Sequence, residues 1–153
     1  MRKFLFLAGA QRFGDAALLL MRLFVGLFLV WGVWDNITSA DRMQEFVEFL
    51  TKAGFPNPKV LAPVSVYLQF LIGLGFVFGL FTRWAGIVCA IHFAIAIAMV
   101  DRFGGMRGIF PSGCLIVIGL YLATYGAGRF SIDAALRANE LPRTAGGGVR
   151  LKT

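Results

Sequence analysis

Four long apolar stretches constrain this chain more than any other feature of its sequence. They cover about residues 16–34, 60–82, 84–100 and 108–127, and Arg22 is the only charged residue in them. A helix needs about 20 apolar residues to cross a hydrocarbon core of about 30 Å. Backbone groups in lipid must find hydrogen bonds within the protein, which favours helices. The sequence therefore predicts an all-α integral membrane protein with a four-helix bundle.

The composition agrees with a chain that lies mostly in lipid. Hydrophobic residues make up 58% of the 153 residues and charged residues only 15%, whereas soluble domains carry roughly a quarter. Because the charges of this basic chain (net +7) lie at the ends of the apolar stretches, they favour contact with membrane lipids over nucleic acid. Cys89 and Cys114 fall inside apolar stretches, which is typical of small buried residues.

The distribution of Lys and Arg predicts which way the bundle points. The side that holds both chain ends carries ten of the 15 basic residues. The other side carries Arg42, Lys52, Lys59, Arg102 and Arg107, together with five acidic residues that cancel their charge. Since Lys and Arg are enriched in cytoplasmic loops, both termini are expected on the cytoplasmic side of the cytoplasmic membrane.

The chain divides into three regions by this interpretation. Residues 1–14 are expected to form a cytoplasmic interfacial arm, residues 15–136 the four-helix transmembrane domain, and residues 137–153 a flexible basic cytoplasmic tail. An amphipathic helix is expected on the outer face from Asp41 to Ala53. Its apolar positions recur at helical spacing and are Met43, Phe46, Val47 and Leu50. It is expected to cover the mouth of the bundle, or alternatively to gate a pocket there.

Polar residues at membrane depth are expensive and mark candidate sites. Several are predicted to converge in the outer half of the membrane, where they would line a ligand pocket: Trp31, Trp34, Asp35, Tyr67, Gln69 and His92. Each also has a structural alternative. The aromatic residues are common anchors at the membrane interface, and Gln69 or His92 can hydrogen-bond to a neighbouring helix. His92 is the only histidine, so neither a metal site nor a haem site is expected.

A second polar pair is expected near the cytoplasmic edge. Arg22 lies about two turns inside the first apolar stretch, and Asp133 follows the last one. We predict a structural ion pair between Arg22 and Asp133. Glycines within the stretches, such as Gly26, Gly75 and Gly119, favour close packing between the helices, although contact with a partner subunit is the alternative.

The order of several short motifs resembles the DoxX family of bacterial membrane proteins. The motifs are Leu20-Met21-Arg22-Leu23, Gly54-Phe55-Pro56, Gly79-Leu80-Phe81-Thr82-Arg83 and Gly126-Ala127-Gly128-Arg129-Phe130-Ser131-Ile132-Asp133. Together they cover about residues 16–136. The resemblance implies a four-helix bundle in the bacterial inner membrane. It also implies a link to redox complexes, because some relatives are subunits of quinone-linked sulfur oxidoreductases.

The chain departs from the family at ionisable positions. Trp31 stands where His is common, Asp35 where Lys is common, and Gln69 where Glu is frequent. An acidic residue common early in the fourth span is absent, with Ser112 nearby. This smaller ionisable set argues against quinone chemistry carried out by the chain alone.

Three functions fit these observations. The first is an accessory or anchoring subunit of a larger, redox-linked membrane complex, with other membrane subunits and lipids as its partners. The alternative is a quinone-binding subunit of a membrane oxidoreductase that uses the outer pocket, with quinone as the cofactor. The second alternative is a transporter of small solutes. No catalytic residues are identifiable, so whether the chain is part of an enzyme stays open.

Overall fold

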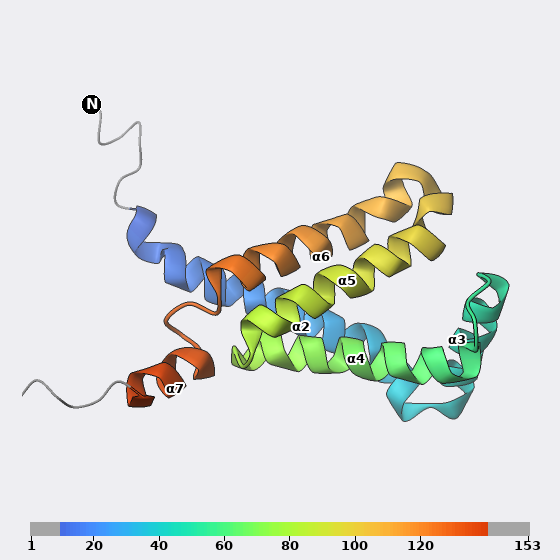
Figure 1. Ribbon diagram of the computed structural model, residues 1–153, viewed down its shortest axis with the longest axis horizontal. Helices are drawn as coiled ribbons and strands as arrows, with labels where there is room; N and C mark the ends of the chain where they lie inside the picture. The colour runs from blue at the N-terminus through green and yellow to red at the C-terminus, as the bar shows by residue number, and fades with distance from the viewer. Residues whose placement is uncertain (1–9, 141–153) are drawn as a thin grey trace, which may run out of the picture.

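The computed structural model describes residues 10–140, which are almost entirely helical (Figure 1). The elements are η1 (Ala10–Phe13), α2 (Gly14–Thr38), α3 (Ala40–Lys52), α4 (Pro58–Phe78), α5 (Thr82–Met99), η2 (Asp101–Gly104), α6 (Gly105–Tyr125) and α7 (Ile132–Glu140). Four of them, α2, α4, α5 and α6, are long and apolar enough to cross a membrane. This confirms the predicted all-α fold with four spans.

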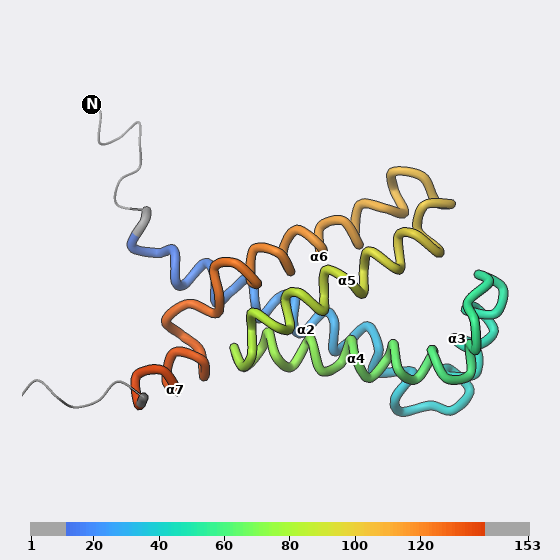
Figure 2. Tube along the Cα trace, viewed as in Figure 1, coloured from blue at the N-terminus to red at the C-terminus, as the bar shows by residue number. Residues whose placement is uncertain are grey.

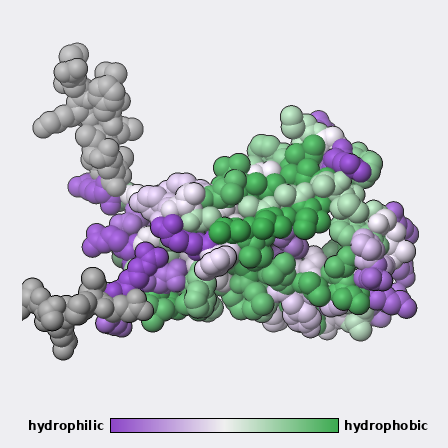
Figure 3. Space-filling model, in the orientation of Figure 1, coloured by the Kyte–Doolittle hydropathy of each residue, from purple (hydrophilic) through white to green (hydrophobic). Residues whose placement is uncertain are grey.

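The surface of these helices suits a lipid environment. Large apolar side chains are exposed on all four, for example Phe24, Leu71, Ile91 and Val117. In Figure 3 hydrophobic residues cover the middle of the visible face and hydrophilic residues gather at its two ends. A soluble bundle would instead bury such residues and expose polar ones.

The described ends of the chain lie at the same end of the bundle, and α3 lies at the opposite end (Figure 1). Asp15 at the start of α2 is 3.9 Å from the Nε of Arg129, which follows α6. This arrangement agrees with an even number of spans. Which end faces the cytoplasm stays a prediction from the charge distribution.

The four spans form two closely packed pairs. Helix α2 packs on α4, and α5 packs on α6. A Cβ atom added to Gly26 would lie 2.7 Å from the carbonyl oxygen of Gly73, and one added to Gly119 would lie 2.7 Å from that of Gly86. Each pair therefore has one glycine-to-glycine contact that lets two backbones touch, as small residues do in membrane helix packing.

The two pairs meet along α4 and α5, and they diverge toward the end that carries α3. Figure 2 shows α5 and α6 leaning away from α4 in that direction. A buried apolar cluster joins the pairs, and its members come from all four spans: Leu18, Val25, Leu29, Ile72, Phe76, Cys89, Phe93, Leu115 and Leu122. The divergence leaves a space between the pairs near α3.

Arg22 ties three segments together at the opposite end. Its side chain is only 1% exposed. Its Nε donates to the carbonyl oxygen of Phe76 at 3.0 Å. Its Nη1 donates to the carbonyl oxygens of Ala127 and Phe130, the latter at 3.0 Å. A Cβ at Gly79 would collide with the guanidinium, so the glycine there leaves room for Arg22.

Asp133, which lies about 50 residues farther along the chain, caps the start of α5. Its two carboxylate oxygens accept hydrogen bonds from the backbone N–H groups of Phe81 and Thr82, each at 2.9 Å. Its own N–H donates to the carbonyl oxygen of Gly79 at 3.0 Å. A carboxylate at a helix N-terminus satisfies free N–H donors and complements the helix dipole.

The direct ion pair predicted between Arg22 and Asp133 does not form between these described residues. The guanidinium of Arg22 donates its hydrogen bonds to backbone carbonyl oxygens. The carboxylate of Asp133 accepts hydrogen bonds from the backbone N–H groups at the start of α5. The two residues still serve one region, because they hold the same turn, around Gly79, from its two sides.

Helix α7 was not expected from the sequence. It runs from Ile132 to Glu140, so the predicted flexible tail begins with helical residues. The rest of that tail, residues 141–153, and residues 1–9 of the predicted arm lie outside the described part of the chain.

Replacing Gly119 with Ala should destabilise the protein by about 1–3 kcal/mol, because the new methyl group would force α5 and α6 apart. The matched control is Gly113→Ala on the same helix, where nothing lies within 4 Å of the added atom. Thermal unfolding in detergent measures both variants. Equal stability of the two variants would contradict the proposed backbone contact.

Replacing Arg22 with Lys should cost roughly 2 kcal/mol or more. A lysine cannot supply the fork of donors that reaches several carbonyls at once, and unpaired buried carbonyls are destabilising. Arg129→Lys is the control, since the Arg129 side chain is 85% exposed and an exposed pair contributes little. The same unfolding assay applies, and a neutral Arg22→Lys variant would argue against the clamp.

Candidate functional site

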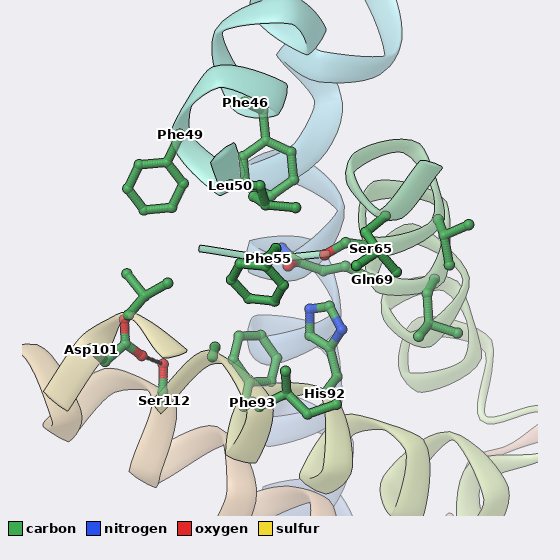
Figure 4. Close-up of a pocket in the computed structure, with 16 residues that line it drawn as sticks. Phe46, Phe49, Leu50, Phe55, Ser65, Gln69, His92, Phe93, Asp101 and Ser112 are labelled. Carbon is green, nitrogen blue, oxygen red and sulfur yellow. Dashed lines mark hydrogen bonds between the residues drawn. The ribbon is translucent and has the colours of Figure 1, made fainter. Parts of the chain in front are cut away.

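A cavity of about 390 Å³ lies between the two helix pairs, at the end that carries α3 (Figure 4). Phe46, Phe49 and Leu50 line it from α3, and Phe55 lines it from the loop that follows. Helices α4 and α5 supply most of the remaining wall, with one residue each from η2 and α6. The cavity exists because the helix pairs diverge at the end where α3 connects α2 to α4.

Helix α3 covers one side of the cavity, as its amphipathic pattern predicted. Ser39 begins the helix, and its hydroxyl accepts a hydrogen bond from the N–H of Arg42 at 3.4 Å. The apolar face of α3 packs into a small core of its own against α4 and the intervening loop, made of Met43, Phe46, Val47, Leu50, Phe55, Leu61 and Ala62. Helix α3 therefore packs on the α2–α4 pair.

Two of the predicted pocket residues, Gln69 and His92, line this cavity from α4 and α5. The side-chain nitrogen of Gln69 donates to the carbonyl oxygen of Leu29 on α2 at 3.3 Å. The His92 ring meets the Phe93 ring edge-on, with centroids 5.0 Å apart. No hydrogen bond among the described residues uses His92, so its ring nitrogens are available to a ligand.

Asp101 and Ser112 belong to the cavity but were missing from the predicted pocket. Asp101 begins η2, and Ser112 lies two turns into α6 with 8% exposure. The Ser112 hydroxyl donates to the Asp101 carboxylate (Figure 4). Both residues lie at the same membrane depth as His92 or farther out. Their depth along the helices is the sequence signal that could have added them to the predicted pocket.

Trp31 and Tyr67 do not face the cavity, contrary to the prediction. Their side chains are 80% and 52% exposed. Along α2 the side that faces α4 carries Gly26, Leu29 and Val33, and Trp31 projects away from it. Residues on one helix at the same depth can point in opposite directions, because successive side chains are about 100° apart.

Asp35 lies in a separate shallow depression between the end of α2 and α3. Its neighbours there include Asn36, Arg42 and Glu45. Arg42 forms an ion pair with Glu45 at 2.8 Å. The hydrogen bond to Glu45, with the added charge of Asp35, raises the pKa of Arg42. Asp35 is therefore part of a charged surface outside the cavity.

Trp34, also expected at the pocket, lies at the edge of the α2–α4 pair. Its ring centroid is 6.4 Å from that of Phe70 on α4, and its side chain is 48% exposed. It does not line the cavity beneath α3. This position suits an interfacial aromatic anchor.

The arrangement is suited to binding rather than to self-contained catalysis. Apolar walls surround a few polar groups, which is typical of small-molecule sites. Residues 10–140 contain no group of three or more His, Cys, Asp or Glu side chains that could hold a metal ion. The polar groups come from four different elements, so the splay of the helices sets the distances between them.

Comparison with known proteins gives one family and one curated relative. The family model described as DoxX matches residues 17–102. The chain is 27% identical over 131 residues to inner membrane protein YqjF of Escherichia coli (strain K12), which covers 82% of this chain and 96% of that protein. No solved structure is significantly similar to the chain.

Proposed function

The chain belongs to the DoxX family of membrane proteins, and we propose that it serves as an accessory subunit that anchors or stabilises a larger membrane complex. Four spans and a relative named as an inner membrane protein support a location in the inner membrane. The excess of basic residues supports cytoplasmic termini. The family resemblance supports a redox-linked complex as the partner.

The outward face of α2 carries this proposal. Five large apolar residues are spaced alternately four and three positions apart along it: Leu20, Phe24, Leu27, Trp31 and Trp34. All five are between 48% and 80% exposed. This is the spacing by which two helices pack along a left-handed seam.

Exposed apolar residues alone would only indicate lipid, because lipid chains accept any apolar face. The heptad spacing places the five residues in one continuous stripe, which is the shape that a second helix packs against. Helix α2 is also free to take one, since it packs on α4 and α3 and leaves this face uncovered within the described chain. A helix of a partner subunit is the occupant that fits an accessory role.

Photo-crosslinking tests this proposal. A benzoylphenylalanine at Phe24 should form an adduct with one protein, and that same protein should co-purify with the chain in mild detergent. The control position is Val117, which is 67% exposed at mid-length of α6 and should give lipid adducts only. Isolation solely as a monomer or self-oligomer, or identical adducts from both positions, would contradict the accessory role.

Quinone binding in the cavity is a second candidate. The apolar walls fit a ring, and Gln69 and His92 can hydrogen-bond to its oxygens. In this role the chain would be a quinone-binding subunit, and the redox chemistry would belong to its partner.

Combined substitution of Gln69 and His92 by Ala should then lower the quinone that co-purifies with the protein several-fold, because both hydrogen-bonding groups would be lost. Solvent extraction followed by chromatography measures it. Val117→Ala, a change on the exposed face of α6 and outside the cavity, is the control. Quinone content that stays the same in the double variant would rule out this candidate.

A further inference from the structure

The cavity beneath α3 has one carboxylate in its wall, and this carboxylate forms no ion pair within the described residues. Among the residues that line it, Asp101 is the only acidic residue, and there is no Lys or Arg. The ion pairs within residues 10–140 join Arg42 to Glu45 and Arg129 to Asp15. Asp101 has Ser112 as its only side-chain partner in that range. The wall of the cavity therefore holds one acidic side chain and no basic one.

The rest of the wall is rich in aromatic rings. Phe46, Phe49, Phe55 and Phe93 all line the cavity. The rings of Phe46 and Phe49 are 6.2 Å apart and nearly parallel, at 15°. The cation–π contacts found in the described residues involve Phe13 and Phe103 instead. These four rings have no protein cation over their faces, although aromatic faces attract cations.

Two hydrogen-bond acceptors stay open in the cavity, beside the free polar groups of Ser65 and His92. Ser112 already donates to Asp101, and the amide nitrogen of Gln69 already donates to Leu29. The carboxylate of Asp101 and the side-chain oxygen of Gln69 stay available. A site with a carboxylate, spare acceptors and phenyl rings attracts a positively charged or donor-bearing group.

We propose that this cavity binds a lipophilic organic cation, such as a quaternary ammonium or phosphonium compound or a protonated hydrophobic amine. The charge of the ligand lies toward Asp101, and its apolar groups contact the phenylalanine rings. A volume of about 390 Å³ accommodates a ligand of small-molecule size. The mostly apolar wall favours a cation that partitions into the membrane.

This inference does not depend on the accessory role. It assigns a cation instead of a quinone to the same cavity. The two ligands differ at Asp101, because a cation supplies a positive charge to this carboxylate and a neutral quinone does not. Asp41 on α3 is exposed and does not line the cavity.

The test compares two probes of nearly the same shape and opposite charge. Tetraphenylphosphonium and tetraphenylborate are titrated against the full chain in nanodiscs, and equilibrium dialysis against empty nanodiscs removes partition into lipid. Saturable binding of the phosphonium to the protein, at least about tenfold tighter than that of the borate, is expected. Equal binding of the two ions, or no saturable binding of the phosphonium, would overturn the proposal without any mutation.

Variants then assign the charge to its residue. Asp101→Asn should weaken phosphonium binding about tenfold, while it keeps an oxygen that can accept from Ser112. Asp41→Asn is the matched control, because it removes a carboxylate from the same end of the bundle but outside the cavity, and binding should not change. An unchanged affinity in Asp101→Asn, with thermal unfolding like that of the parent, would show that the carboxylate does not hold the cation.

Discussion

The buried guanidinium of Arg22 is the interaction on which the rest of this structure depends. A charge inside a membrane span is costly unless polar groups surround it. Here backbone carbonyls at the end of α4 and after α6 accept its hydrogen bonds. Asp133 binds the start of α5 beside it. Hydrogen bonds thus join α2, α4, α5 and the segment after α6 at one end of the bundle. The helix pairs diverge at the other end.

The glycine contacts explain why the opening takes the form of two pairs. Gly26 with Gly73 and Gly86 with Gly119 hold two backbones together within each pair, with a Cβ added to Gly26 or Gly119 only 2.7 Å from the carbonyl oxygen of the other glycine. The glycine contact between the pairs is looser, since a Cβ added to Gly75 would lie 3.2 Å from the Cβ of Ala85. The helices are therefore arranged as two pairs that lie closest at the Arg22 end and diverge toward α3. The cavity is a consequence of this arrangement, and α3 covers it because the short α2–α3 and α3–α4 connections hold it at the open end.

The sequence predicts well the features that depend on local hydropathy. It predicts poorly which side of a helix each side chain faces. The four spans and α3 follow from the lengths and periods of apolar residues, which short segments encode. Depth placed Gln69 and His92 near each other, and both line the cavity. Depth does not give the side of a helix, so Trp31 and Tyr67 were placed in the cavity although they face outward. Likewise, opposite charges placed Arg22 and Asp133 together, but the hydrogen-bond needs of nearby backbone groups decided their actual partners.

Hydrogen-bond saturation separates the structural polar residues from those that can act on a ligand. Arg22 and Asp133 have their donors and acceptors occupied by backbone groups, so they have little left to offer a ligand. His92 has no hydrogen bond within the described residues, and Asp101 is joined only to Ser112. Both residues are half-buried in a mostly apolar wall. These two residues therefore keep hydrogen-bonding groups that a ligand in the cavity can use.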